Sequence, residues 1–202
     1  ESEQLSDSQT QPIIPILFYR SMLLAADAAP IDELTRALEA RGISAVPIFV
    51  TSLKDPASLA FVEKALAELN PAAIITATAF AAGAEPGEQT LFDRAGVPVF
   101  QVITATTRRE AWEENQRGLA PADLAMHVVL PELDGRILAG AISFKAQSQS
   151  NDYRGLSNQP EPNRIEQVAA RIERFLRLAD TTRENRKLLI LIPDYPAAEG
   201  RT

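Results

Sequence analysis

The sequence contains no cysteine and a single histidine, His127. Without thiols the chain can form neither a disulfide nor a thiolate metal site, and one imidazole excludes a zinc site built from histidines alone. A metal-binding role would therefore have to rest largely on oxygen ligands.

Long apolar runs and an excess of positive charge are also missing. No segment approaches the roughly 20 apolar residues that span a bilayer, and residues 1–11 lack the basic and apolar regions of a signal peptide. These absences favour a cytoplasmic protein without a membrane span. A net charge of -7 argues against binding to nucleic acid or to an anionic membrane. With 46% hydrophobic residues, the 202-residue chain can still form a packed core.

Several catalytic motifs are absent as well. The sequence has neither the G-x-x-x-x-G-K-[ST] phosphate loop nor the G-x-G-x-x-G of dinucleotide-binding domains, so we do not expect it to hydrolyse ATP itself. It also lacks the G-x-S-x-G nucleophile elbow, and no nucleophile on a sharp turn accompanies His127. Hydrolase chemistry is therefore disfavoured.

What the first half does contain is an alternation of short β-rich runs and helical patterns, which is typical of a parallel α/β sheet. The predicted strands cover residues 13–19, 44–50, 72–78 and 97–103. Helices are predicted between them, one of which is capped by Asp55 and ended by Asn70. We predict a doubly wound, mostly parallel sheet with flanking helices, Rossmann-like or flavodoxin-like, and a less regular second half.

The second half is predicted to carry short helices at 107–116 and 121–126 and strands at 127–130 and 137–144. A long helix should follow a capping box formed by Asn163 and Glu166, and a buried strand should occupy residues 187–192. We therefore divide the chain into a disordered leader (1–11), an α/β domain (12–145), a mobile loop (146–160) and the start of a following unit (161–202). On this view the chain is a fragment that stops at residue 202.

Polar side chains follow each of the four predicted parallel strands. In such sheets ligands bind outside the carboxyl ends of the strands. The four cations in these loops could converge on an anion that carries several carboxylates, or they could be solvated charges that pair with the acidic surface. Together with these cations, the candidate residues of the four loops are Tyr19, Arg20, Ser21, Lys54, Phe80, Arg108 and Arg109.

The Pro-Glu-Leu-Asp-Gly run at residues 131–135 is the strongest local candidate for chemistry. In an extended segment Glu132 and Asp134 would point to the same face, because they are two residues apart. Two such carboxylates could bind a hard divalent cation, or one could act as an acid or base. Alternatively, Asp134 and Gly135 form a routine turn, Glu132 is a solvated charge and His127 is a satisfied residue at the start of a strand.

The residues themselves resemble a known family. RGLAPADLAMHVVLPELDGRI, followed by AISFK, is similar to the large subunit of the ATP-dependent aerobic cobaltochelatase, which is related to the porphyrin-binding large subunit of magnesium chelatase. The segments YRSMLLAADAAPIDELTRALEARG, PIFVTSLKD, GVPVFQVITA and LLILIPDYP follow in the family's order. The resemblance thus covers nearly everything from Pro12 onward. Arg136 and the AISFK segment favour the cobalt type.

The resemblance implies an enzyme subunit, a ligase that forms cobalt–nitrogen bonds in cobalamin biosynthesis. It would hold hydrogenobyrinic acid a,c-diamide while Co(II) is inserted, and two smaller AAA+ partner subunits would hydrolyse ATP with Mg(II). Large subunits of this family are several times longer, so the fragment would depend on the remainder of its parent chain and be inactive alone. The alternatives are a magnesium chelatase-like subunit acting on protoporphyrin IX and a non-catalytic scaffold or docking domain.

The same resemblance suggests roles for individual residues. Glu132 and Asp134 would be catalytic, and His127 and Glu132 would be cobalt ligands. Phe144 could line a ring face, whereas Trp112 is expected in the core or at an interface. The candidate substrate-binding residues are Tyr19, Arg20, Ser21, Lys54, Phe80, Arg108, Arg136 and Lys145.

Overall fold

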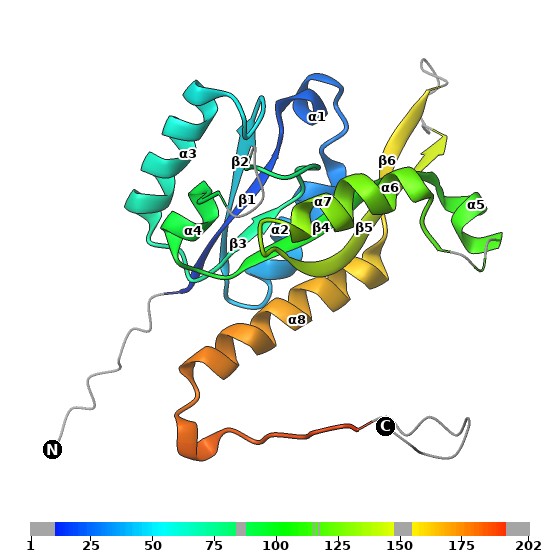
Figure 1. The fold of residues 1–202 in the computed structure, drawn as a ribbon. Coiled ribbons are helices and arrows are strands. Elements are labelled where there is room, and N and C mark those ends of the chain that lie inside the picture. Colours follow the sequence, from blue (N-terminus) through cyan, green and yellow to red (C-terminus); the bar gives the residue numbers. More distant parts are fainter. Residues whose placement is uncertain (1–10, 84–87, 115, 117, 148–154, 193–202) are drawn as a thin grey trace, which may run out of the picture.

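A six-stranded sheet forms the centre of the molecule, as the computed structural model in Figure 1 shows. The structure describes residues 11–83, 88–114, 116, 118–147 and 155–192, so the predicted leader lies almost wholly outside it. The strands are β1 (Ile13–Tyr19), β2 (Ser44–Val50), β3 (Ile74–Thr76), β4 (Val99–Arg108), β5 (Ile137–Gln147) and β6 (Leu156–Pro160). Their order in the sheet is β2-β1-β3-β4-β5-β6.

The first five strands run parallel, and only β6 is antiparallel to its neighbour β5. The order 2-1-3-4-5 is that of flavodoxin-like folds, in which the direction of winding reverses between β1 and β3. The predicted mostly parallel α/β sheet is therefore confirmed. The reversal opens the crevice where such folds bind ligands, at the carboxyl ends of β1 and β3.

Helices cover both faces of the sheet. On one face α2 (Ala29–Glu39) and α8 (Pro162–Asp180) pack on the strands, and the Phe175 ring of α8 meets Phe100 of β4 edge-on at 5.2 Å between centroids. On the other face α3 (Pro56–Leu69) and α4 (Leu91–Ala95) pack on β1 and β2. Ile14–Phe18 of β1 are buried on both sides, as an interior parallel strand requires. The long helix α8 thus shares its core with the α/β residues that precede it.

The two ends of α3 confirm local predictions, whereas the start of α8 does not. The Asp55 carboxylate accepts the Ser58 N–H at 2.9 Å and caps α3, and Asn70 ends that helix in the left-handed conformation, with φ 44°. The capping box predicted for Asn163 and Glu166 is wrong. Pro162 is the first residue of α8, which places Asn163 inside the first turn, and Glu166 pairs instead with Arg41 at 2.6 Å.

The segment before the acidic turn is helical, so the strand predicted at 127–130 is wrong. Helix α6 (Pro121–Leu124), the π-helix η1 (Ala125–Val129) and α7 (Leu130–Glu132) follow one another without a break. Helical spacing places Asp123 and His127 one turn apart, and both are buried. We call residues 121–132 the helical run. Its burial against β4 overrides the strand preference of the local Val-Val-Leu sequence.

The strands of the second half are longer than predicted. β4 continues to Arg108, so the helix predicted at 107–116 is reduced to α5 (Arg109–Glu114). Part of the predicted loop 146–160 forms β6, which pairs with β5 at the edge of the sheet. Residues 148–154 of that loop lie outside the described residues.

The buried strand predicted at 187–192 is also wrong. Beyond α8 and the short 3-10 helix η2 (Arg183–Asn185), residues 188–192 belong to no strand, and their side chains are between 71% and 87% exposed. A strand needs a neighbour for its backbone and cover for its apolar side chains. The edge strands of the described sheet are β2 and β6, and residues 188–192 pair with neither of them.

The loop between α1 (Arg20–Leu24) and α2 is tied to the opposite edge of the sheet. The Asp27 carboxylate accepts hydrogen bonds from Lys145 Nζ and Asn158 Nδ2, both at 2.8 Å, and from the Asn158 backbone N–H. The last contact satisfies a backbone donor of the edge strand β6. None of the helices in the described ranges combines the length and apolarity needed to cross a membrane.

We expect Asp27→Ala to lower the free energy of unfolding by about 1–3 kcal/mol, because it leaves half-buried donors without their acceptor. Urea unfolding followed by circular dichroism measures this change. Glu39→Ala, at an exposed position of α2, is the control and should have almost no effect. Equal changes in the two variants would contradict the role of Asp27.

Candidate functional site

A loop after β3 lies against the carboxyl end of β1. We call residues 77–83 the Phe80 loop. At the end of β1 the Tyr19 hydroxyl donates to the Ala79 carbonyl oxygen at 3.0 Å. Burial raises the pKa of Tyr19, although the charge of Arg136 acts in the opposite direction. The protonated phenol is therefore the form that holds the loop.

Arg136 lies beneath the Phe80 loop, and its side chain has no exposed surface. Nη1 donates to the Thr78 carbonyl at 3.2 Å and to Gln101 Oε1 at 3.0 Å, and Nη2 donates to the Phe80 carbonyl at 3.0 Å. The guanidinium carbon also lies 4.8 Å from the centroid of the Phe92 ring. Arg136 is thus occupied by protein groups, and its predicted contact with a substrate stays a prediction.

Asp134 is the charged partner of this arginine. Its Oδ2 accepts from Arg136 Nη2 and from the Ala82 N–H, both at 2.7 Å, and Oδ1 accepts from the Gly83 N–H at 3.4 Å. Burial lowers the pKa of Arg136, and the Asp134 charge and hydrogen bond oppose that shift. Only 3% of the Asp134 side chain is exposed.

Glu132 and Asp134 do not share a face, contrary to the sequence-based geometry. The segment is a helical end followed by a turn that Gly135 completes with φ 69°, so the alternation of an extended strand does not apply. Glu132 is exposed to solvent and Asp134 points inward. Of the two carboxylates, Glu132 is therefore the one open to a ligand.

His127 is buried within the helical run, with 6% of its surface exposed. The neighbouring Asp123 accepts hydrogen bonds from the backbone and hydroxyl groups of both Thr106 and Thr107. Burial alone would raise the pKa of Asp123, but these four hydrogen bonds outweigh it and lower the pKa. Burial lowers the pKa of His127, and the charge of Asp123 only partly offsets this. The imidazole is therefore neutral at pH 7.

The structure does not bring the two predicted cobalt ligands together. His127 lies in the π-helical turn and Glu132 at the end of α7. One is buried and the other exposed. Within the described ranges no three His, Asp or Glu side chains form a cluster that could hold a metal ion. Joint ligation by these two residues would require a rearrangement.

The helical run is joined to the Phe80 loop by its backbone. The Phe80 N–H donates to the Met126 carbonyl in the π-helical turn at 2.8 Å. Phe80 itself adopts the left-handed conformation, with φ 63°, and its ring is 47% exposed. The exposed aromatic side chain therefore stands on a loop whose backbone is fixed from both sides.

The four cations predicted to converge are divided between two regions. Arg20 lines a groove of about 570 Å³ between β2 and α3, and the exposed Lys54 lies in the loop at its end. Arg108 lines a separate hollow by β5 and β6, and Arg109 pairs with Glu161 at 2.7 Å. Two strands, β1 and β3, lie between β2 and β4 in the sheet, so the two regions do not merge.

Other candidates are placed less favourably for a ligand. Ser21 is exposed beside Arg20, whereas Lys145 is held by Asp27. Phe144 is fully buried and stacks on Trp112 at 4.5 Å between centroids. Sequence reasoning missed Phe49 and Phe61, which are 51% and 60% exposed and line the Arg20 groove, because no motif or pattern distinguishes an exposed phenylalanine from a buried one.

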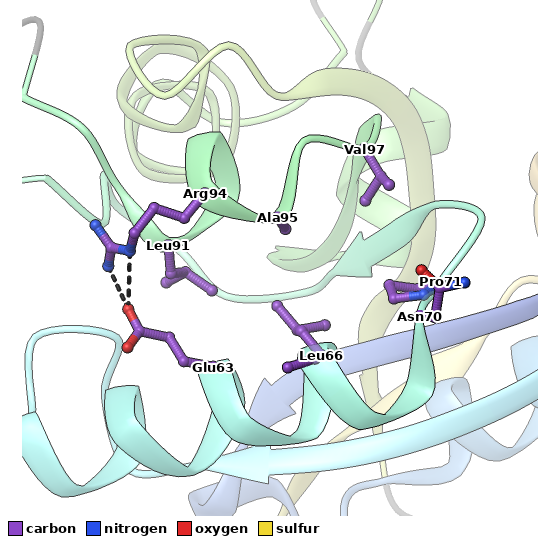
Figure 2. Close-up of a pocket in the computed structure, with 9 residues that line it drawn as sticks. Glu63, Leu66, Asn70, Pro71, Leu91, Arg94, Ala95 and Val97 are labelled. Carbon is purple, nitrogen blue, oxygen red and sulfur yellow. Dashed lines mark hydrogen bonds and ion pairs between the residues drawn. The ribbon is translucent and has the colours of Figure 1, made fainter.

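Another hollow, of about 320 Å³, lies between α3 and α4. Figure 2 draws the residues that line it. The Glu63 carboxylate and the Arg94 guanidinium close one end with an ion pair, and Leu66 and Leu91 form part of its apolar wall. None of the predicted site residues lines it. The candidate site therefore consists of the Phe80 loop, the exposed Glu132 and the Arg20 groove.

Comparisons with known proteins agree on one family. The family model described as CobN/Magnesium Chelatase matches residues 1–202. The aerobic cobaltochelatase subunit CobN of Sinorhizobium sp is 36% identical over 196 residues, and that of Pseudomonas aeruginosa is 36% identical over 194 residues. The chloroplastic magnesium-chelatase subunit ChlH of Oryza sativa subsp. indica is 27% identical over 210 residues.

A solved structure is similar as well. The catalytic subunit of cobaltochelatase from Mycobacterium tuberculosis superposes with a TM-score of 0.71 at 28% identity, over 87% of this chain and 15% of that one. The two CobN relatives are matched over 94% and 95% of this chain but only 15% and 16% of their own length. The rice subunit is matched over 98% of this chain and 14% of its length.

The buried neutral imidazole makes stability depend on pH. Because the folded-state pKa of His127 lies below the ordinary value of about 6.5, the unfolded chain binds a proton more readily below that pH. We expect the free energy of unfolding to be highest above pH 6.5 and to fall by up to about 1.4 kcal/mol per unit between pH 6.5 and 5. Urea titrations at several pH values measure this slope.

His127→Gln is the matched variant, because it keeps a polar side chain that does not titrate. Its unfolding free energy should be flatter over the same range. The chain has one histidine, so its imidazole proton resonance also reports the pKa directly by NMR. A value at or above 6.5 in the folded chain would contradict the expectation.

Proposed function

Because the chain belongs to the CobN/magnesium chelatase family, we propose that it forms part of the tetrapyrrole site of a cobaltochelatase large subunit. The reaction would be insertion of Co(II), as substrate metal, into hydrogenobyrinic acid a,c-diamide. ATP with Mg(II) would be hydrolysed by two AAA+ partner subunits. The observation that carries the proposal is Glu132, an exposed carboxylate in a segment that the Phe80 loop contacts on both sides.

The chemistry of metal insertion favours an exposed carboxylate. Protons must leave the ring nitrogens and water must leave the metal ion before the nitrogen–cobalt bonds form. A positioned carboxylate can accept a proton or donate an oxygen ligand to the ion during transfer, and general bases typically contribute about 10²–10⁴-fold. Glu132 is suited to either task because its side chain is exposed to solvent. His127 would take part only if its buried imidazole became accessible.

The ring itself would be held by apolar and cationic groups. Phe80 offers a half-exposed aromatic face, and Tyr19 supports the loop beneath it. Arg20, Ser21 and Lys54 are exposed next to the same end of β1 and β2 and would bind the peripheral carboxylates. Arg108 and Lys145 would be reached only by a ligand that extends across the sheet edge toward β5.

We expect Glu132→Gln in a full-length large subunit to leave ring affinity nearly unchanged and to reduce cobalt insertion at least 100-fold, since the amide cannot accept the proton. Insertion is measured by the absorbance change of the macrocycle in the presence of both partner subunits and ATP. Glu110→Gln, another exposed acid, is the control and should retain activity. Unchanged insertion by Glu132→Gln would remove its catalytic role.

Arg20→Ala and Lys54→Ala should each weaken ring binding by about two- to tenfold at low salt, and the difference from wild type should shrink as salt screens the charges. Absorbance titration of the chain with the macrocycle at 20 mM and 500 mM salt tests this. Arg174→Ala, an exposed cation on α8, serves as the control. A loss of affinity that is the same at both salt concentrations would argue against an electrostatic role.

A second candidate function is a scaffold or docking domain. The exposed apolar segment at residues 188–192 favours it, because such a surface is typical of contacts with other protein segments. Failure of the isolated chain to bind any macrocycle would support this alternative. The similarity to the rice ChlH subunit makes protoporphyrin IX the other macrocycle to compare. Competition between the two rings distinguishes a cobalt-type from a magnesium-type site.

A further inference from the structure

Of the three charged residues at 132–136, Glu132 faces solvent, whereas the side chains of Asp134 and Arg136 are buried. We propose that Asp134 and Arg136 are positioning residues, which fix the Phe80 loop against the segment that carries Glu132 and do not contact the substrate. This positioning role rests on the proposed function, because the ligand that the Phe80 loop would hold is the tetrapyrrole ring of that proposal. It replaces the catalytic role predicted for Asp134 and the substrate-binding role predicted for Arg136.

The first step of the argument is the buried ion pair. The side chains of Asp134 and Arg136 are 3% and 0% exposed, and both form hydrogen bonds with the Phe80 loop. The carboxylate accepts the Ala82 and Gly83 N–H groups, while the guanidinium donates to the Thr78 and Phe80 carbonyls. The pair therefore holds both ends of the loop. Among the described residues, Arg136 Nε is the one polar atom of the pair without a hydrogen-bond partner, and it is buried away from solvent.

The second step is the conformation of Phe80. The left-handed conformation is strained for a residue other than glycine, so surrounding contacts must hold Phe80 there. The Phe80 carbonyl is held by Arg136 and the Phe80 N–H by the Met126 carbonyl. Loss of the arginine contact would remove one of these two restraints. The loop would then relax and carry the Phe80 ring away from its position.

The third step is what the loop connects. Tyr19 joins it to the end of β1, Met126 joins it to the helical run, and Asp134 joins it to the turn after Glu132. The aromatic ring and the exposed carboxylate are thereby held in a fixed relation to each other. A macrocycle that rests on Phe80 would meet Glu132 at a defined place. Small displacements of this kind are costly to catalysis.

A double-mutant cycle tests the proposal. The 202-residue chain is titrated with hydrogenobyrinic acid a,c-diamide by absorbance, using Phe80→Ala, Asp134→Asn and the double variant. Each single change should weaken binding roughly tenfold, and the double variant should be no more than about twofold weaker than either, because Asp134 acts through Phe80. Multiplication of the two effects to roughly a hundredfold would overturn the proposal. Asp27→Asn with Phe80→Ala is the control pair, whose effects should multiply.

Hydrogen exchange supplies a readout that needs no ring. The Phe80 amide donates to Met126 and not to Asp134. Asp134→Asn should nevertheless speed its exchange at least tenfold, together with that of Ala82 and Gly83. An unchanged Phe80 amide would show that Asp134 acts only locally and would overturn the positioning role. If the wild-type chain binds no ring, the proposed function fails for this chain, and the exchange result still decides the role of Asp134.

Arg136→Lys guards against a variant that fails to fold. Lysine keeps a positive charge for Asp134 but cannot reach the Thr78 and Phe80 carbonyls at once with a planar fork. We expect the same faster exchange at Phe80 while the circular dichroism spectrum stays native. Wild-type exchange at Phe80 in this variant would contradict the proposal.

Discussion

The carboxyl edge of this sheet is organised around one buried cation. A guanidinium without water must find an opposite charge and acceptors for its donors, because an unpaired buried charge is strongly destabilising. The two Nη groups of Arg136 meet this demand with the Asp134 carboxylate, Gln101 and two carbonyls of the Phe80 loop, while Nε has no partner among the described residues. Since the donors of a guanidinium lie in one rigid plane, these partners must occupy set positions. The Phe80 loop, the turn that carries Asp134 and the strand that carries Gln101 are thereby fixed in position relative to one another.

Local sequence sufficed where local forces decide the structure. β1 and β2 have the predicted bounds, because their apolar runs are long enough for strands and are bracketed by loop residues. Asp55 caps α3 as expected, since a cap depends on residues three positions apart. The prediction failed at residues 127–130, where β-branched residues suggested a strand and the burial of Asp123 and His127 on one helical side decided otherwise.

The candidate site was only partly visible in the sequence. The motif drew attention to Glu132 and Asp134, but it could not show that one faces solvent and the other the interior, because that depends on a helical end and a turn. The partners of Arg136 were hidden for another reason. Two of them are backbone carbonyls, and no side-chain pattern marks a carbonyl that lies close in space. The candidate cations lie in two separate regions because of the order of the strands in the sheet, and the hydrophobic periodicity of the sequence does not reveal that order.

The aromatic stack beside β5 gives the molecule an internal optical reporter. Trp112 is the single tryptophan, and its ring stacks on the Phe144 ring. The Arg164 guanidinium lies 4.5 Å from the centroid of the Trp112 ring. These three side chains come from α5, β5 and α8, which are far apart along the chain. The indole emission spectrum therefore registers whether the long helix is seated on the sheet. Unseating α8 would remove a cation from the indole face and let water reach the ring, shifting its fluorescence to longer wavelength.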